Sequence, residues 1–465
     1  MPKGYRTYLP EQDLLLPPSL REWLAEEHLV YFVSDVVDEL DLAAIHAVYG
    51  EEKRGQPPYD PRLMTKLLVY GYCTGVFSSR RIQKRLQEDI PFKVLAAGNE
   101  PDFRTISDFR KQHIGALQGL FEQVLAMALE VGAVKVGRVS LDGTKVKANA
   151  SKHKAMSYDR MEGTAQRLRQ EVDELLRKAA AADEAEDAQY GKGNSGDELP
   201  AELARRESRL KKIREAKAEL EQEAKENAEK ERAEAEAKIA ERREKEAKTG
   251  KKAGGHDPKV PDTEQAKPEP KAQRNFTDME SRIMPDGGNK GSFVQGYNAQ
   301  AAVDSQAQVI VAAEITQQTN DKQQLVPMIK LVVANTGSKP IAVSADTGYW
   351  SEANVGDESV AGVDLHIATG RQKHGEKLAM ATGPPPEDAT PKEAMAHKLR
   401  TEAGKSIYKM RKAIVEPVFG QIKERRGFRR FSFRGVGSVR LEWKLICLTG
   451  NILKLFRSGW SPEMA

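Results

Sequence analysis

Two aspartates stand where apolar, strand-like segments end. Asp142 follows Val139-Ser140-Leu141 and precedes Gly143-Thr144, whereas Asp346 follows residues 341–345 and precedes Thr347-Gly348. Functional groups of open sheets gather at the carboxyl ends of strands. If the two strands are neighbours, the carboxylates meet at one edge of the sheet, where a hard divalent cation would join them. The alternative for each aspartate is an ordinary Asp-containing turn.

Glu416 is the third carboxylate that the pattern singles out. It lies in a predicted helix where residues 405–430 hold nine Lys/Arg and only two acids. Lys412 and Lys423 lie four and seven residues from Glu416, on its face of a helix. A simple ion pair between Lys412 and Glu416 is the alternative. Because the residue before a proline avoids helical geometry, we expect a kink or a helix start at Glu416-Pro417.

The charge of the chain is concentrated near its C-terminal end. The 465 residues carry a net charge of only +4, yet residues 401–460 hold 14 Lys/Arg against 4 Asp/Glu. Clustered cations of this kind indicate a surface that binds phosphates. The length exceeds what one hydrophobic core usually holds, so we expect two or three structural units.

The remaining bulk features indicate an intracellular protein. Cys73 and Cys447 form neither a zinc-binding pattern nor a disulfide framework, which fits a reducing cytoplasm. The N-terminus has no apolar signal core, and no apolar run approaches the length that spans a bilayer. We therefore expect a cytoplasmic location and no membrane contact.

Hydrophobic periodicity divides the chain into helical and α/β parts. From Pro61 to about Val131 the spacing is helical, and near Val134 it changes to that of strands. The later elements are predicted as strands Phe293–Val303, Val309–Ile315, Ile341–Ala345 and Asp364–Ala368, a helix Gln323–Ala334, and two helical stretches at about 403–426 and 438–456.

A charged insertion separates the first strand from the others. Within it Leu203, Leu210, Ile213 and Leu220 keep a heptad-like spacing. This spacing predicts a helical hairpin or short coiled coil that frays into a disordered stretch at 250–273. A single solvated helix without a partner is the alternative.

Several motifs resemble one protein family, the insertion-sequence transposases with an RNase H-like core and a DDE metal triad. The resemblance covers almost the whole chain except the insertion. It rests on residues 59–64, 71–81 and 102–110 for the N-terminal part, and on Asp142-Gly143-Thr144, Ala345–Tyr349 and Tyr408–Lys423 for the catalytic part.

The last motif departs from one common family pattern of tyrosine, two residues, arginine, three residues, glutamate, six residues and lysine. Tyr408 and Arg411 each precede Glu416 by one residue too many, whereas Lys412 and Lys423 keep the expected distances. The phosphate-facing role is therefore open between Arg411 and Lys412.

The resemblance implies an α/β fold: an RNase H-like mixed sheet with flanking helices, preceded by an all-α N-terminal domain and interrupted by a long charged helical insertion. The implied division is a helical DNA-binding domain at 1–132, the first part of the catalytic core at 133–154, the helical or coiled-coil insertion with a disordered end at 155–274, and the rest of the core at 275–460.

The resemblance also implies a chemistry. Asp142, Asp346 and Glu416 would bind two Mg²⁺ or Mn²⁺ ions around a scissile phosphate, and the enzyme would cut and join the ends of an insertion sequence. Its partners would be DNA, as terminal inverted repeats and target DNA, and a second copy of the chain in a homodimer. The rival interpretations are a metal-dependent nuclease without strand transfer and a non-catalytic DNA-binding protein.

DNA contacts are expected from two basic groups. For the group on the N-terminal helices, the alternative is an ordinary solvated helix face. Tyr349 and Trp350 could either stack on a base or pack under the sheet. The expected DNA-binding residues are Arg80, Arg81, Lys84, Arg85, Tyr408, Arg411, Lys412, Lys423, Arg425, Arg426, Arg429, Arg430 and, beyond that helix, Arg434.

Overall fold

The N-terminal region is helical, as its periodicity predicts. The computed structural model describes residues 19–49, 57–190, 201–249, 256–286, 291–370 and 379–460. The N-terminal elements are η1 (Leu20–Trp23), α1 (Leu29–Asp38), α2 (Ala43–Tyr49), α3 (Pro61–Thr74), α4 (Ser79–Glu88), α5 (Ile90–Ala96), α6 (Phe103–Gln112) and α7 (Ile114–Glu130).

Helix α3 shows how the local sequence sets its ends. The Asp60 side chain accepts the Arg62 backbone N–H, and Pro61 occupies the first turn, where its missing N–H costs nothing. The helix ends at Gly75, which has a φ of 79°. A Cβ on Gly75 would stand 2.5 Å from the carbonyl oxygen of Arg426, so only glycine allows this close approach to the C-terminal part.

The second part of the chain is built on a mixed sheet. Its strands are β1 (Arg138–Lys147), β4 (Arg282–Pro285), β5 (Phe293–Asp304), β6 (Ile310–Thr316), β7 (Ala342–Ala345) and β8 (Asp364–Ile367). The order is β4-β5-β1-β7-β8, and β6 pairs with β5. Strand β5 is antiparallel to β1 and β6, whereas β7 is parallel to β1 and β8. Strands β1, β6, β7 and β8 therefore all point the same way.

Strand β1 is longer than predicted. The predicted strand end at Asp142 is not observed, because β1 pairs with β5 without interruption from Val139 to Lys147. That prediction was wrong, as was the alternative of a turn at Asp142, because this residue lies inside the strand. Gly143 serves a different purpose here, since neighbouring side chains occupy the space that a Cβ would fill.

Helices pack on the sheet and connect it to the N-terminal region. They are α10 (Leu325–Thr336), α11 (Glu352–Val355), α12 (Pro391–Arg400), α13 (Glu402–Gly420), the π-helical turn η5 (Gln421–Arg425) and α14 (Val436–Arg457). Helix α13 crosses β1, β5, β7 and β8, and α14 contacts β6, α3 and α7. Because most of α14 is buried, one hydrophobic core joins the N-terminal helices to the sheet.

Pro417 does not break α13. The helix continues from Glu402 to Gly420 with the proline inside it, so the expected helix start at Glu416-Pro417 was wrong. The irregularity comes later, in the π-helical turn Gln421–Arg425. A π-turn adds one residue to the helical repeat and changes which side chains share a face. Here the change falls after Glu416.

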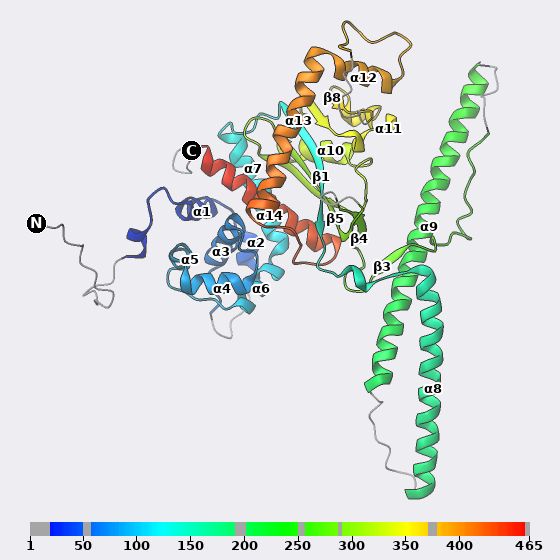
Figure 1. The fold of residues 1–465 in the computed structure, drawn as a ribbon. Helices are drawn as coiled ribbons and strands as arrows, with labels where there is room; N and C mark the ends of the chain where they lie inside the picture. The colour runs from blue at the N-terminus through cyan, green and yellow to red at the C-terminus, as the bar shows by residue number, and fades with distance from the viewer. Residues whose placement is uncertain are drawn as a thin grey trace, which may run out of the picture.

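The insertion forms an arm that projects from the core (Figure 1). Strand β2 (Ala155–Ser157) leads into α8 (Tyr158–Tyr190), and α9 (Ala201–Thr249) packs against α8 before β3 (Gln273–Asn275) pairs with β2. The helical hairpin is thus confirmed, and the single-helix alternative was wrong. Residues 256–272 form no helix or strand, while the start of the predicted disordered stretch and the Leu203 side chain lie outside the described residues.

The arm has a small hydrophobic core of its own. Its members are Met156, Met161, Leu168, Leu210, Ile213, Ala216 and Leu220, and they form a cluster separate from the main core. Three of the four predicted heptad positions are therefore buried where the two helices meet. Most of the other described side chains on the two helices are exposed, and many of them are charged.

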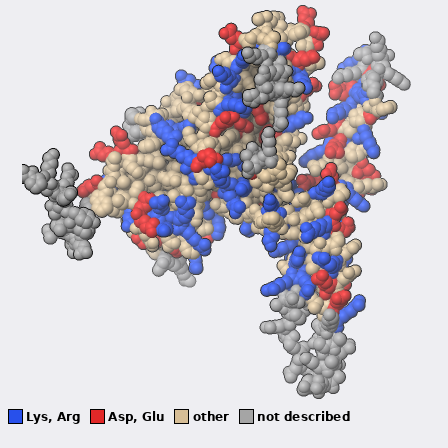
Figure 2. All heavy atoms as spheres, in the orientation of Figure 1, with Lys and Arg blue, Asp and Glu red and all other residues tan. Residues whose placement is uncertain are grey.

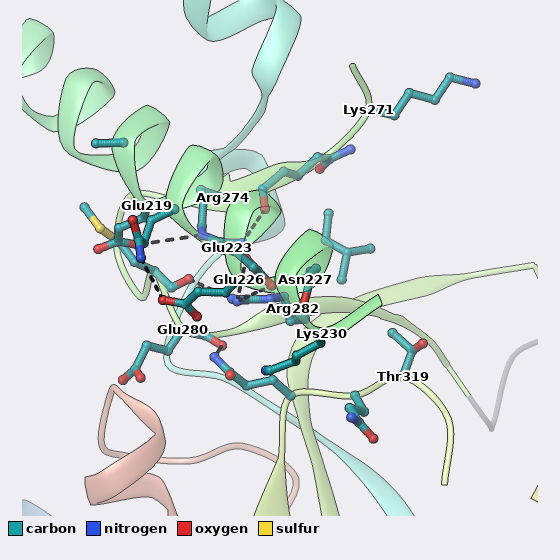
Figure 3. A pocket seen from close by; sticks show the side chains of 17 residues that line it. Glu219, Glu223, Glu226, Asn227, Lys230, Lys271, Arg274, Glu280, Arg282 and Thr319 are labelled. Carbon is teal, nitrogen blue, oxygen red and sulfur yellow. Dashed lines mark hydrogen bonds and ion pairs between the residues drawn. The ribbon is translucent and has the colours of Figure 1, made fainter. Parts of the chain in front are cut away.

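Ion pairs hold the arm where it leaves the sheet. Arg274 on β3 is buried and pairs with Glu223 of α9, and Arg282 on β4 lies 3.4 Å from the same carboxylate (Figure 3). Glu219 adds a further contact to Arg274 at 3.7 Å. These residues line a groove of about 1340 Å³ between α9 and strands β3 and β4.

The separate core of the arm makes a testable prediction. Replacing Ile213, which is 1% exposed, by alanine leaves a cavity between α8 and α9 and should destabilise the hairpin by about 2–5 kcal/mol. Amide hydrogen exchange should accelerate in α8 and α9 and remain unchanged in the sheet. The matched control is Lys212→Ala, because Lys212 is an exposed neighbour. Equal acceleration in the sheet would contradict an independent arm.

Candidate catalytic carboxylate site

The parallel pairing of β1 and β7 brings the two predicted aspartates together. Ser140 pairs with Ser344, and their hydroxyl oxygens lie 2.8 Å apart in a buried hydrogen bond. Side chains alternate along a strand, so residues two positions further on face the same side. Those residues are Asp142 and Asp346. The register of the sheet therefore sets the two carboxylates next to each other.

A third aspartate, Asp321, reaches the same place from β6. Because β6 runs in the direction of β1, the chain after its last residue emerges at the same edge of the sheet. The Asp321 carboxylate accepts hydrogen bonds of 2.7 Å from both Asn298 and Gln300 of β5. These amides fix Asp321 beside β1.

Two glycines make room for the three carboxylates. A Cβ on Gly143 would lie 2.6 Å from Asp321 Oδ1 and 2.9 Å from Asn298 Oδ1. A Cβ on Gly348 would lie 2.9 Å from Asp346 Oδ1 and 3.3 Å from Asp321 Oδ2. Asp321 and Asp346 thus flank one glycine, whose backbone N–H also donates to Asp346 at 2.8 Å.

Two cations offset the negative charge of the cluster. Arg411 of α13 lies 3.3 Å from Asp142 Oδ2 with its side chain only 9% exposed, and Lys145 lies 3.8 Å from Asp321. Burial raises the pKa of Asp142 to about 6, and the charges of Asp346 and Asp321 raise it as well, while Arg411 and the Gly143 N–H act in the opposite direction. Burial lowers the pKa of Lys145, against the pull of the three aspartates.

Two tyrosines surround the cluster. Tyr349 is fully buried and donates a hydrogen bond to Gln300, the residue that holds Asp321. Burial and the three aspartates hold the pKa of Tyr349 well above its usual range, so its hydroxyl keeps its proton. Tyr349 therefore packs under the site, and the stacking alternative was wrong for it. Tyr408 of α13 is half-buried, with the Arg411 guanidinium 5.9 Å from its ring centre.

Glu416 does not join this cluster. It lies five residues after Arg411, so it points about 140° away around a regular helix. Its side chain is exposed, and it makes no hydrogen bond or ion pair with any residue that the structure describes. A π-turn between Arg411 and Glu416 would correct this register, but the only one in this helix region follows at Gln421–Arg425.

The carboxylates are close but are not yet arranged as a ligand set. Over the described ranges, no group of three or more His, Cys, Asp or Glu side chains is positioned to hold a metal ion. Arg411 occupies the Oδ2 side of Asp142. Metal binding would therefore require Arg411 to move away from that oxygen.

The predicted DNA-binding residues fall into an exposed set and a buried set. Arg80, Arg81, Lys84 and Arg85 are exposed on α4, although Lys84 and Arg85 form ion pairs with Glu88 and Asp89. In the C-terminal group Lys412, Arg425, Arg429 and Arg430 are exposed, and Figure 2 shows Lys and Arg gathered across the middle of this face of the core. Lys423 is half-buried and donates to the carbonyl of Lys145 at 2.8 Å.

Arg426 was wrongly placed in the DNA-binding set. It is 6% exposed and donates hydrogen bonds to the carbonyl of Ile446 at 3.2 Å and to Thr449 Oγ1 at 2.7 Å. A further contact reaches the carbonyl of Tyr72 at 3.5 Å. A buried arginine needs such acceptors, and here they come from α3 and α14. Arg426 therefore fixes the N-terminal region against the core.

The sequence prediction missed Asp321 because the residue lies five positions beyond its strand. The signal was nevertheless present, since Val309–Ile315 was predicted as a strand and Asp321 follows it in the polar segment 316–324. The direction of β6 decides whether Asp321 reaches the same edge of the sheet as Asp142. A single sequence does not reveal that β5 reverses the chain and sends β6 to the same edge as β1.

Comparisons with known proteins identify two segments of this chain. The family model described as Transposase domain (DUF772) matches residues 18–112, and the model described as Transposase DDE domain matches residues 371–456. Together they confirm the resemblance to DDE-type insertion-sequence transposases that the motifs predict. The second match includes Glu416 and Arg411, while the three aspartates lie between the matched segments. No curated protein and no solved structure matches the chain.

Among the described helices, none combines the length and the apolar character that a bilayer-crossing segment requires. The two cysteines are free and buried.

The ion pair between Arg411 and Asp142 can be tested by titration. Arg411→Ala removes the nearest positive charge, so the pKa of Asp142 should rise above its value of about 6. Carboxyl ¹³C shifts of aspartate-labelled, metal-free protein would follow the change. Lys412→Ala is the matched control, because Lys412 is the exposed neighbour. An unchanged titration in the Arg411 variant would contradict the ion pair.

Proposed function

We propose that this protein is a transposase that cuts and joins the ends of an insertion sequence by metal-dependent phosphoryl transfer at the Asp142, Asp321 and Asp346 cluster. The two transposase domains support the class of protein. The observation that carries the site is the convergence of three carboxylates from β1, β6 and β7 at one edge of the sheet. The mixed sheet with flanking helices supports an RNase H-like core, and the division at 1–132, 133–154, 155–274 and 275–460 is part of the same proposal.

The residues of the cluster fit a divalent cation chemically. Carboxylate oxygens are the ligands that Mg²⁺ and Mn²⁺ prefer. The cluster holds three carboxylates in a partly buried place, and two cations, Arg411 and Lys145, lie against it and offset part of their charge. The cluster is therefore suited to bind additional positive charge. Asp142, Asp321 and Asp346 would hold the ions. Bound there, two such ions would activate a water or 3′-hydroxyl and stabilise the leaving oxygen.

The protein's own groups position the reacting strand. Asn298 and Gln300 fix Asp321, and the Tyr349 hydroxyl in turn fixes Gln300. A cation held by Asp142 would compete with Arg411 for that carboxylate, and the Arg411 guanidinium would then be available to a DNA phosphate beside the site. Lys412 is exposed on another side of α13, so it is not placed to contact a phosphate at the carboxylate site as Arg411 is.

DNA is the proposed substrate, as terminal inverted repeats and as target. The exposed cations of α4, α13 and the turn after α13 would contact its phosphates, which position DNA without reading its sequence. We propose a homodimer in the assembled complex because two transposon ends must be brought together.

One prediction concerns Asp142 and Asp346, which the pairing of β1 with β7 brings together. Asp142→Asn and Asp346→Asn should each lower cleavage at a transposon end about 100-fold or more, since ligand loss exceeds the effect of losing a supporting group. Binding to the inverted repeat should stay near that of the unmodified protein, as a mobility-shift assay would show. Full cleavage by either variant would contradict the proposal that this cluster is the catalytic site.

Another prediction separates the role of Asp321 from that of Glu416. Asp321→Asn should weaken Mn²⁺ binding, measured calorimetrically on the protein alone, and should abolish cleavage. Glu416→Gln should preserve Mn²⁺ binding, because Glu416 is exposed and outside the cluster. The opposite result would restore the triad of Asp142, Asp346 and Glu416 that the motif predicts.

The nuclease interpretation differs from transposition in one step. A nuclease cuts but does not join, so pre-cleaved transposon ends mixed with a target plasmid distinguish the two. Joined products support a transposase. Cleavage without joining would support the metal-dependent nuclease, and inactivity of the unmodified protein in both assays would favour the non-catalytic DNA-binding protein.

A further inference from the structure

A second groove lies beyond the far end of β1 and has a different charge from the arm groove. It has a volume of about 660 Å³ and is lined by residues of segments 147–154 and 293–295 together with Thr277, Arg430 and Arg434. Its charged lining residues are Lys147, Lys152, Lys154, Arg430 and Arg434, with His153 beside them. Among the described residues, no Asp or Glu lines it. A groove of this kind attracts a polyanion.

The cations of this groove are available to a ligand. All five Lys and Arg side chains are exposed, and within the described ranges none of them forms an ion pair. This contrasts with α4, where Lys84 and Arg85 are paired with acids. Exposed cations without acidic partners are the groups that neutralise phosphates.

Hydrogen bonds to backbone carbonyls fix the walls of the groove. The N–H of Phe431 donates to the carbonyl of Lys147 at 2.9 Å, and the N–H of Ala148 donates to the carbonyl of Gln295 at 2.9 Å. Asn149 reaches the carbonyl of Ser432 at 2.7 Å, and Arg434 reaches the carbonyl of Asn149 at 3.0 Å. The groove is therefore formed before any ligand binds.

An exposed aromatic ring stands at the groove. Phe293, the first residue of β5, is 56% exposed although it is among the largest apolar side chains. An aromatic face at the surface, next to phosphate-binding cations, suits a nucleic-acid base. In a duplex the faces of the bases are covered by their neighbours. Phe293 would therefore stack more readily on an unpaired base than on a base inside a duplex.

The groove is connected to the carboxylate cluster along one strand. Lys147 follows Asp142 by five residues on β1, which is roughly 16 Å of extended chain. Lys145 and Lys423 lie between them, joined by a hydrogen bond of 2.8 Å. Lys145, Lys423 and Lys147 thus place positive charge between the carboxylate cluster and the groove.

We infer that this groove binds a short single-stranded stretch of the DNA that is being cut, with Lys152, Lys154 and Arg430 on its phosphates and Phe293 stacked on an unpaired base. This inference rests on the proposed function for its substrate. It predicts that DNA next to the scissile phosphate leaves the duplex on this side of the protein.

The test measures binding of a fluorescent ten-nucleotide oligothymidine to metal-free protein, so no chemistry is required. Phe293→Ala should weaken binding roughly 5- to 100-fold without changing its salt dependence, because the ring carries no charge. The Lys152→Ala/Lys154→Ala double variant should weaken binding and reduce the slope of log affinity against log salt by about 1.4. The variants replace exposed side chains, and thermal melting checks that they fold.

Matched controls come from exposed residues elsewhere. Ile341→Ala removes an apolar side chain that is 71% exposed, and Lys211→Ala/Lys212→Ala removes two exposed lysines of the arm. Both should bind the oligonucleotide as the unmodified protein does. Loss of binding in these controls equal to that in the groove variants would overturn the inference.

Further outcomes distinguish single-stranded from double-stranded DNA in the groove, and the inference from the proposed function. A ten-base-pair duplex should bind the Phe293→Ala variant as well as it binds the unmodified protein, and an equal loss for duplex would overturn the single-strand assignment. Unchanged oligonucleotide binding in the groove variants would overturn it too, even if the protein cleaves transposon ends. Conversely, normal groove binding by a protein that never cleaves DNA would contradict the proposed function alone.

Discussion

The repulsion between three carboxylates at one edge of the sheet is the constraint on which the site depends. Strands β1, β6 and β7 run in the same direction, so the side chains of Asp142, Asp321 and Asp346 meet. Like charges in a partly buried place are unfavourable unless cations or protons offset them. Burial is the main cause of the raised pKa of Asp142, and the charges of Asp346 and Asp321 raise that pKa further. Arg411 and Lys145 lie against the cluster and offset part of its negative charge.

The position of Arg411 depends on how α13 and the N-terminal helices pack against the sheet. Helix α13, which carries Arg411 to Asp142, crosses four strands. The turn that follows α13 is held by Arg426, which is buried against α3 and α14. A buried guanidinium with several carbonyl acceptors tolerates little movement. The N-terminal region is thereby fixed relative to the carboxylates, whereas the arm, with its own small core, is an addition to this arrangement.

Sequence periodicity predicted the elements well and their spatial relations less well. The N-terminal helices, the strands leading to Asp142 and Asp346 and the hairpin of the arm follow from apolar spacing, because burial of one face imposes that spacing. Asp321 was missed because its role depends on strand direction. Arg426 was misassigned because exposure of a cation is decided by tertiary packing. Glu416 was chosen because of its motif. It follows Arg411 by five residues, whereas four would place it on the same face of α13 as Arg411, which contacts the cluster.

The most direct measurement is a crystal structure of the protein soaked with Mn²⁺, with anomalous scattering used to locate the ions. The account predicts anomalous peaks coordinated by Asp142, Asp321 and Asp346, with the Arg411 guanidinium moved away from Asp142 Oδ2. Peaks coordinated by Glu416 with Asp321 still bound only to Asn298 and Gln300, or no peak at the sheet edge, would contradict it.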